Sequence, residues 1–569
     1  MKVSDYIVDL LSKHGIRVIF GHIGGFNADI VDSFHSKSAN HFVLGYHEQA
    51  SSFAANAYSV ISDNIGVAIS SGAPSTCNLI GGIANAYFDS NACLFIVGSV
   101  HSKAVRQSRN IRQNAFEEID ICSLVSDITK YAVKIKNADE IKYEIEKAIY
   151  VAMHGRRGPV VIDIPYDISR SDADESLLKG FDAPAITESD TSYLDKVQEI
   201  LMNSRKPVIL VGGGSRLGNS RNLLKQFLNK VRIPVVASLC GLDVLSHDHE
   251  CFAGFVGHYG NRYANLALAN ADCVVILGSR LDERQMGGYK SQFAAGAKLI
   301  RVDIDANEIN RRFQETVSIC GTVENFLNNV TELDVSDSNF QAWHSVIKKW
   351  KNRYPSYDLG SKEVNANNFL HAISDYLSDD AVVCADVGQN QMYVAQSVRL
   401  DGNRRLLNSA GYGTMGFSLP AAIGAAYANK TMILSVNGDG GIQMNIQELQ
   451  TIKRDNLPIN IIVLNNSCLG MIRSLQHNMF EDRTYVSVNG YSCPNFADVA
   501  EAYDIPYLCI DSVDKYADFS AFVSDSHPTF TEVVLPFGSN NPEPGQMLDN
   551  QKPFLSKSDV ELIKMEVDL

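Results

Sequence analysis

The sequence lacks three features that would point to particular classes of protein. Its 11 cysteines form no CxxC pair and no regular spacing, so neither a zinc site nor a disulfide framework is indicated. No apolar run approaches the ~18 residues that a membrane-spanning helix needs. Acidic residues outnumber basic ones, 65 to 50, and this balance argues against nucleic acid or an anionic membrane as a partner. The N-terminus also lacks a signal-peptide pattern, and we expect a protein of the reducing cytoplasm.

What the sequence does have is length and a large apolar fraction. Its 569 residues allow about three domains of ~150–200 residues, and 45% of them are hydrophobic. Short apolar runs alternate with helical segments along the chain, a pattern typical of α/β domains with doubly wound parallel sheets. We expect domains at 1–170, 196–335 and 360–540, joined by an acidic linker at about 170–195. A tail at 541–569 ends in a short helix predicted from about Ser556.

The most informative stretch follows the apolar run 432–436, which has the character of a buried parallel strand. Gly438-Asp439-Gly440-Gly441 comes next, then a helix predicted over 442–454 and a second buried strand over 459–464 that ends on Asn465-Asn466. Glycines at the end of a strand leave backbone N–H groups free at the following helix N-terminus, where phosphate binds readily. On its own, Gly-Asp-Gly also fits an ordinary tight turn.

Two oxygen-bearing side chains in this stretch indicate a metal site. Asp439 offers a carboxylate and Asn466 an amide oxygen. Mg²⁺ prefers oxygen ligands, and it commonly binds protein oxygens and phosphate oxygens at the same time. A Gly-Asp-Gly separated from Asn-Asn by residues 441–464 resembles the diphosphate and metal motif of thiamin-diphosphate (ThDP) enzymes. The resemblance implies bound ThDP and Mg²⁺, with Asp439, Asn466 and the backbone carbonyl of Cys468 as the metal ligands.

Glu48 follows the apolar run 42–44, and ligands of open α/β sheets are usually met at such strand ends. For a lone glutamate, a solvated carboxylate at a helix start is the alternative. The surrounding segments resemble the first domain of the acetohydroxyacid synthase branch of ThDP enzymes; they are 21–25, 47–49, 71–78, 84–90, 115–120 and 158–165. In that family the glutamate hydrogen-bonds N1′ of the aminopyrimidine ring and favours an imino tautomer that removes the C2 proton of the thiazolium. The resemblance therefore assigns Glu48 to catalysis.

The middle of the chain resembles the flavin-binding domain of acetohydroxyacid synthases in two segments, 254–265 and 278–284. The resemblance implies bound FAD, with Arg280 as a flavin contact and Arg284 near the acceptor substrate. A middle domain that keeps the fold and binds nothing is the alternative, and Arg284 also fits a structural salt bridge. The glycines at 212–214 do not complete GxGxxG, because Leu217 stands at the third glycine position, so a Rossmann nucleotide motif is not predicted.

Further site residues come from the same resemblance. Gly388-Gln389-Asn390 matches a diphosphate contact, and Met415 matches the apolar wedge that bends the cofactor, although its spacing alone would place it in the core. The catalytic residues expected are Glu48, Gly25, Met415, Glu117 and Arg284. The cofactor-binding residues expected are Glu48, Asn78, Gly213, Arg280, Arg284, Asp303, Gly388, Gln389, Asn390, Gly413, Met415, Gly438, Asp439, Gly440, Gly441 and Met471.

The resemblance extends from Val3 to about Pro536 and implies three doubly wound domains, which are pyrimidine-binding, central and possible FAD-binding, and diphosphate-binding. It implies a ThDP-dependent lyase or transferase, a carboligase that decarboxylates a 2-oxo acid, pyruvate, and transfers the acetyl unit to a second carbonyl. It also implies a homodimer or homotetramer with intersubunit active sites, in which Glu48 and Asp439 of different chains serve one site.

Four positions depart from a plain acetolactate synthase: Leu475 replaces Trp, Glu117 replaces Gln, Tyr166 replaces Lys and Ile23 replaces Pro. Losing a Trp opens the acceptor pocket, since an aromatic fills ~150–250 Å² of contact. The changes resemble a sub-branch that transfers the acetyl unit to nucleotide-linked 4-keto-deoxysugars, and we predict such an acceptor. The alternatives are an acetohydroxyacid synthase catalytic subunit and a pyruvate oxidase or decarboxylase. A non-catalytic scaffold is disfavoured because Glu48, Asp439 and Asn466 are all present.

Overall fold

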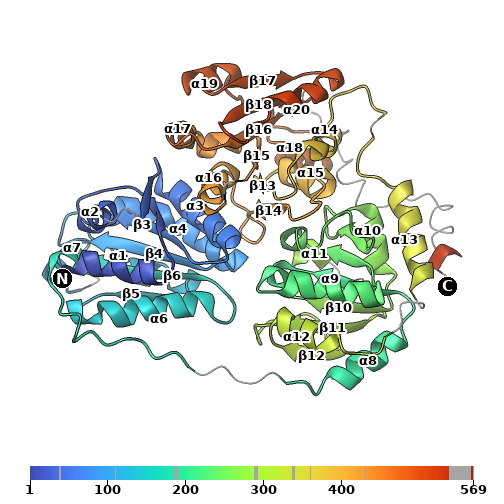
Figure 1. Cartoon of the computed structure of the whole chain (residues 1–569). Helices are drawn as coiled ribbons and strands as arrows, with labels where there is room; N and C mark the ends of the chain where they lie inside the picture. Colours follow the sequence, from blue (N-terminus) through green and yellow to red (C-terminus); the bar gives the residue numbers. More distant parts are fainter. Residues whose placement is uncertain are drawn as a thin grey trace.

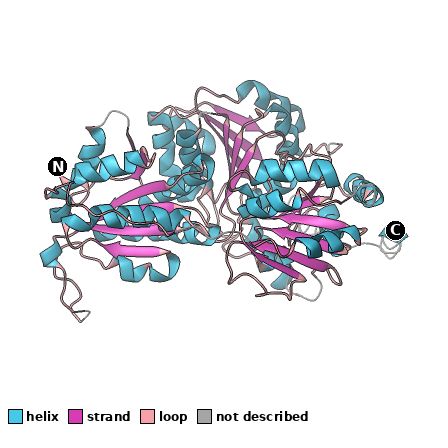
Figure 2. Ribbon diagram, turned by 60° about the horizontal axis from the view of Figure 1, so that its bottom comes forward, coloured by secondary structure: helices cyan, strands magenta, loops and turns pink. Residues whose placement is uncertain are grey.

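The computed structural model describes the chain except residues 37–39, 109, 185–189, 287–292, 336–339, 359, 430, 537–564 and 568–569. It contains three six-stranded sheets in which every strand pair is parallel, and helices cover both faces of each sheet (Figures 1 and 2). The predicted α/β fold of three doubly wound domains is therefore confirmed. The domain boundaries stay predictions; the sheets themselves occupy 18–165, 207–320 and 382–534.

The first sheet has the order β2-β1-β3-β4-β6-β5. Its strands are β1 Val18–Gly21, β2 His41–Leu44, β3 Gly66–Ser71, β4 Cys93–Ser99, β5 Tyr131–Lys134 and β6 Pro159–Pro165. Its helices are α1 Val3–Lys13, α2 Ala28–His35, α3 Glu48–Ser62, α4 Gly72–Asp89, α5 Ile121–Leu124, α6 Ile141–Met153 and α7 Tyr166–Arg170.

The middle sheet has the order β12-β11-β10-β7-β8-β9. Its strands are β7 Pro207–Val211, β8 Val235–Ala237, β9 Phe252–Phe255, β10 Cys273–Leu277, β11 Lys298–Asp303 and β12 Val317–Cys320. The helices of this region are α8 Leu194–Met202, α9 Ser220–Val231, α10 Arg262–Ala269, α11 Glu283–Met286, α12 Val323–Val330 and α13 Gln341–Arg353. Counted along the domain, the order is 3-2-1-4-5-6, the order of dinucleotide-binding folds, although the glycine motif is incomplete.

The third sheet has the order β14-β13-β15-β16-β18-β17, which repeats the topology of the first sheet. Its strands are β13 Val382–Ala385, β14 Arg405–Asn408, β15 Ile433–Gly438, β16 Ile459–Asn465, β17 Tyr507–Ile510 and β18 Thr529–Val534. Its helices are α14 Ala366–Ile373, α15 Gln389–Ser397, α16 Ser418–Ala428, α17 Leu449–Arg454, α18 Gly470–Met479, α19 Phe496–Ala502 and α20 Asp518–Phe522.

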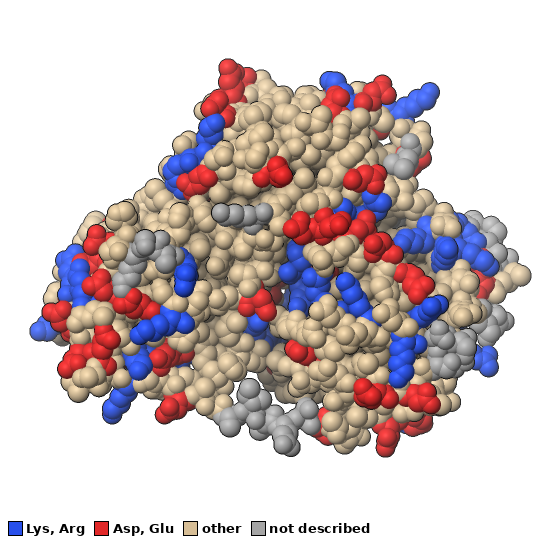
Figure 3. Space-filling view, in the orientation of Figure 1, with Lys and Arg blue, Asp and Glu red and all other residues tan. Residues whose placement is uncertain are grey.

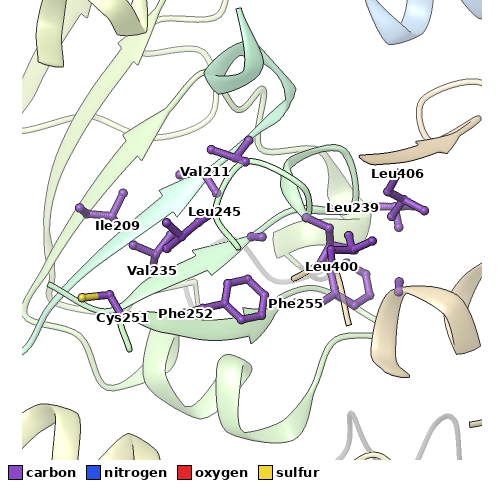
Figure 4. Close-up of a cluster of buried hydrophobic side chains, with 14 of the residues drawn as sticks. Ile209, Val211, Val235, Leu239, Leu245, Cys251, Phe252, Phe255, Leu400 and Leu406 are labelled. Carbon is purple, nitrogen blue, oxygen red and sulfur yellow. The ribbon is translucent and has the colours of Figure 1, made fainter. Parts of the chain in front are cut away.

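The apolar cores continue across domain boundaries, which places the domains firmly against one another. One cluster joins buried residues of α3 and α16, with the rings of Phe53 and Phe417 5.6 Å apart. Another joins the middle sheet to Leu400 and Leu406 of the C-terminal domain (Figure 4). Burial of such continuous surfaces is favourable by about 25 cal/mol per Å² of apolar area, so the interfaces between domains are as much part of the core as the sheets are.

One predicted segment differs from the structure, and one strand passes into its helix without a loop. After β3, α4 begins at Gly72, whose φ of +73° lets the chain turn at once from strand to helix. The helix predicted over 442–454 is instead two 3₁₀ turns, η9 Ile442–Met444 and η10 Ile446–Glu448, before α17. Asn445 interrupts the helix at φ −138°, because its side chain donates 2.8 Å to the carbonyl of Gly416.

Two further observations complete the fold. The helix predicted from about Ser556 lies outside the described residues, apart from a helical turn at 565–567. None of the helices in the described part of the chain combines the length and the apolar character that crossing a membrane requires.

Candidate active site

The carboxyl edge of the C-terminal sheet gathers the residues predicted to hold diphosphate and metal. Asp439 and Asn466 follow the adjacent strands β15 and β16, and both are buried, as is Cys468. Burial raises the pKa of Asp439 to about 6. Asn466 donates 3.1 Å to Gln389 Oε1 at the start of α15, so residues from three strand ends meet here. Parallel sheets hold ligands at this edge, beside the point where the strand order reverses between β13 and β15.

The glycines of this edge leave no room for side chains. A Cβ on Gly441 would lie 1.9 Å from Asp386 Oδ2, and one on Gly470 would lie 2.0 Å from Gln389 Oε1. The close approach of Asp386 and Gln389 therefore requires glycine at these two positions. The segment after Gly441 is too short and irregular to act as the expected helix N-terminus; the regular helices that begin at this edge are α15, after Gly388, and α18, which contains Met471.

Asp386 holds the loop that carries Met415. Its carboxylate accepts hydrogen bonds from the backbone N–H groups of Gly416 (3.2 Å) and Phe417 (2.8 Å). Met415 is partly exposed rather than part of the core, and its Cε is 3.8 Å from the position of a Cβ on Gly440. Gly413, in the left-handed region at φ +74°, has open space beside it. Met415 therefore stands next to the glycine loop, where a wedge would be needed.

Glu48 is the first residue of α3, directly after the loop that follows β2. Its Oε2 accepts a hydrogen bond of 2.9 Å from Asn78 Nδ2 on α4. Partial burial raises the pKa of Glu48, but hydrogen bonds from Asn78 and Ser75 outweigh it and lower the pKa below its usual value. Glu48 thus carries a charge held in one orientation, and Asn78 is exposed at the same opening.

The other expected catalytic residues of the N-terminal domain lie at the same edge of the first sheet. Glu117 has a left-handed backbone (φ +58°), and its Oε2 is 2.1 Å from the position of a Cβ on Gly72. Gly25 has open space beside it. Tyr166 lies near Phe26, with ring centroids 5.8 Å apart, and Ile23 is 49% exposed. Leu475 is an exposed residue of α18 in the C-terminal domain.

A cavity of about 620 Å³ lies where the three domains meet, and Gly213, Arg280, Arg284 and Asp303 all line it. Figure 3 shows basic side chains around the hollow in this region. At its floor a Cβ on Gly212 would lie 2.3 Å from the carbonyl of Gly278, because the two loops cross at the reversal point between β7 and β10. Arg280, expected at a flavin, Arg284, expected near the acceptor, and the expected cofactor-binding residues Gly213 and Asp303 are therefore brought together in one cavity.

Two arginines of this cavity reach other domains. Arg280 donates to the carbonyl of Phe88 at 3.3 Å and to Asp282 at 3.1 Å. Arg284 contacts the sulfur of Met392 at 3.9 Å, and no acidic side chain among the described residues pairs with it. Among the described residues, Arg284 therefore forms no structural salt bridge.

Further charged side chains lie at this cavity: Asp89, Arg216 and Arg405 line it, and Asp243 stands behind the two arginines. Asp89 accepts hydrogen bonds from the backbone N–H groups of Gly411 (2.6 Å) and Ala410 (3.3 Å), and burial raises its pKa to about 6. The buried Asp243 pairs with Arg216 (2.5 Å) and Arg405 (2.9 Å). Asp89 lies in the segment 84–90 that resembles the family's first domain, whereas Asp243, Arg216 and Arg405 belong to no motif identified in the sequence.

Tyr491 is a further residue without a motif. Its hydroxyl donates 2.9 Å to Asp439 Oδ2, from the loop after α18. Groups that orient a metal ligand affect metal affinity by 10–100-fold. We expect Tyr491→Phe to weaken Mg²⁺ binding by about 10–100-fold, measured by titrating Mg²⁺ at saturating ThDP. Tyr485→Phe, on a 76% exposed tyrosine of the same loop, is the control. Equal Mg²⁺ affinity in Tyr491→Phe and wild type would contradict this role.

Comparisons with known proteins cover almost the whole chain. Three family models match it: the N-terminal TPP binding domain of thiamine pyrophosphate enzymes at residues 1–124, their central domain at 194–330 and their C-terminal TPP binding domain at 386–533. The acetolactate synthase large subunit of Lactococcus lactis subsp. lactis (strain IL1403) is 34% identical over 538 residues, covering 94% of this chain and 92% of that protein. Acetolactate synthase 2, chloroplastic, of Zea mays is 33% identical over 561 residues, covering 94% and 85%.

Proposed function

This chain belongs to the thiamine pyrophosphate enzymes and is an acetolactate synthase-like carboligase, and we propose that it joins the two-carbon unit of one pyruvate to a second pyruvate. The observation that carries the proposal is similarity to acetolactate synthase large subunits over 94% of the chain, in a sequence that has Glu48, Asp439 and Asn466. The nucleotide keto-sugar acceptor predicted from four departures finds no support in these comparisons, which favour the alternative prediction.

The residues at the C-terminal edge suit ThDP and Mg²⁺. Asp439, Asn466 and the Cys468 carbonyl would supply hard oxygen donors, and helix α15, which begins at this edge, would offer the N–H groups of its first turn to the diphosphate. Among the described residues no group of three or more His, Cys, Asp or Glu side chains is arranged to hold a metal ion. A Mg²⁺ ion at Asp439 and Asn466 would take its remaining ligands from phosphate and water. When bound, ThDP supplies the electron sink for decarboxylation. Glu48, oriented by Asn78, would hold the proton at ring nitrogen N1′ of that cofactor.

We further propose that one site takes residues from two chains. The hydrogen-bond partner of the Glu48 side chain lies in the N-terminal domain and that of Asp439 in the C-terminal domain. Helix α18, beside the metal edge, buries none of its residues; its large apolar side chains Ile472, Leu475 and Met479 are 45–68% exposed. Phe116, next to Glu117, is 81% exposed. Apolar surface around two half-sites supports a homodimer that covers it and completes both.

The cavity between the domains is the proposed FAD site. We expect Arg280→Leu to weaken FAD binding by about tenfold or more, because charge-assisted hydrogen bonds to the cofactor are lost. Flavin fluorescence during titration of the cofactor-free protein measures the affinity. Arg483→Leu removes an exposed arginine paired with Glu481 and is the control. Unchanged FAD affinity in Arg280→Leu would place the flavin elsewhere.

Pyruvate as the sole substrate tests the function. With ThDP, Mg²⁺ and FAD, the purified protein should convert two pyruvates into one acetolactate and one CO₂. Slow CO₂ release with little acetolactate would contradict the proposal that the acceptor is a second pyruvate. It would favour nucleotide keto-sugars as the acceptors. Tyr166 in place of Lys and the exposed Leu475 are the observations that favour that second candidate. Oxygen uptake with pyruvate would instead indicate oxidase chemistry.

A further inference from the structure

A buried carboxylate of the C-terminal domain binds the backbone just before Glu48. Glu448 Oε1 accepts hydrogen bonds from the N–H groups of Tyr46 (2.9 Å) and His47 (3.1 Å), more than 400 positions earlier in the chain. Its Oε2 accepts 2.7 Å from the hydroxyl of Thr451. Glu448 is 1% exposed, so these donors replace water almost completely. A buried carboxylate is tolerated only where its hydrogen bonds are made, and here they join two domains.

These hydrogen bonds fall at the start of helix α3. Tyr46 and His47 immediately precede the helix, where N–H groups have no partner within the helix, and a negative charge there is favoured by the helix dipole. Farther along, α3 touches α16 so closely that a Cβ on Gly424 would lie 2.0 Å from the carbonyl of Ala54. The C-terminal domain therefore holds α3 at its middle by packing and at its start by Glu448.

The chain just before Glu448 touches the rest of the candidate site. Asp439 lies nine positions earlier, as the two residue numbers give. Between them, Asn445 donates to the carbonyl of Gly416, and a Cβ on Gly416 would lie 2.5 Å from Met444 Cβ. The segment 439–448 thus begins at the metal edge, passes against the loop that carries Met415 and ends on the backbone before Glu48.

We propose that Glu448 is a positioning residue for Glu48. Glu448 fixes the first turn of α3 and connects it to the segment that begins at Asp439. The proposal rests on the proposed role of Glu48. A displacement of about 1 Å in a catalytic group can lower the rate by about 10²-fold. The packing of Phe53, Ala54 and Ala55 keeps α3 in place without Glu448, so the first turn alone should move.

Glu448→Gln and Glu448→Met form a matched pair of similar length. The glutamine oxygen can accept from both N–H groups while its NH₂ group donates to Thr451, whereas methionine offers no comparable acceptor. In the cofactor-free protein, hydrogen exchange of the Tyr46 and His47 amides, measured by mass spectrometry, should be about tenfold faster or more in Glu448→Met and near wild type in Glu448→Gln. This measurement does not depend on the proposed function.

In the protein loaded with ThDP and Mg²⁺, exchange of the cofactor C2 proton should be about 10²-fold slower in Glu448→Met, with ThDP affinity within about threefold of wild type. Glu448→Gln should restore the rate, which a general loss of stability would not explain. If Glu448→Met does not fold, Glu448→Asp replaces it in both exchange measurements, because the aspartate side chain is too short to reach both N–H groups. Wild-type exchange of both the amides and the C2 proton in Met or Asp variants would overturn the proposal. Slow C2 exchange in wild type itself would instead contradict the proposed function.

Discussion

Replacing Glu48 by glutamine is expected to slow pyruvate decarboxylation by about 10²–10⁴-fold, the range that a positioned acid or base contributes. Glutamine has the same shape and can still accept the hydrogen bond from Asn78. It cannot exchange a proton with N1′ of the cofactor, so the change removes proton control while leaving the site assembled. Single-turnover release of CO₂ measures the loss, and the Kd of ThDP checks that binding remains.

Glu144→Gln is the matched control for Glu48→Gln. Glu144 lies on helix α6 of the same domain, and its carboxylate accepts a hydrogen bond from Tyr131 away from the candidate site. It should decarboxylate pyruvate at the wild-type rate. If Glu48→Gln also retained nearly the wild-type rate, the catalytic assignment of Glu48 would be wrong.

Replacing Asp439 by asparagine is expected to weaken Mg²⁺-dependent ThDP binding by about 10²-fold or more, because the charge of the ligand set governs the affinity for hard cations. Isothermal titration with ThDP at fixed Mg²⁺ measures the change. Asp455→Asn, on a carboxylate held by Arg454 and Tyr427, is a control outside the metal edge. Wild-type affinity in Asp439→Asn would remove Asp439 from the metal site.

The stability of Asp439→Asn separates loss of a ligand from misfolding. Burial raises the pKa of Asp439 to about 6, above the ordinary value of 3.8. The folded state then binds this proton more tightly than the unfolded state, so the carboxyl favours folding at low pH and loses that contribution as pH rises from about 4 through about 6. In chelator, Asp439→Asn should therefore melt above wild type at pH 7, and the difference should shrink toward pH 4. A lower melting temperature at pH 7 would contradict this.

The sequence by itself determined the parts of the protein that depend on local pattern. The run of β10 is continuous in apolar residues, and those of β15 and β16 are mostly apolar, because both faces of a parallel sheet are covered. Residues that follow such strands meet at one edge, so the neighbourhood of Asp439 and Asn466 could be predicted without coordinates. Gly213, Arg280, Arg284 and Asp303, the expected cofactor-binding residues of the middle domain, also line one cavity, since they lie at or after the ends of strands of a single sheet.

The sequence pattern did not predict most of the edge strands. The sequence analysis does not identify the edge strands β5, β9, β12, β14 and β17, nor the inner strand β18. Each of these edge strands has only four residues, and β12, Val317–Cys320, alternates buried and exposed positions. A strand so short is stabilised by the neighbour it pairs with, and pairing is a property of the folded sheet.

Only the tertiary structure decided the contacts between distant single residues. Glu448 sits in a segment predicted to be helical, and only Asn445 bound to Gly416 breaks that helix into 3₁₀ turns and brings Glu448 to the backbone before Glu48. Tyr491 and Asp89 likewise find their partners across loops and domains. The physical reason is that such hydrogen bonds depend on where separate elements dock, and docking is governed by the packing of whole cores rather than by any local run of residues.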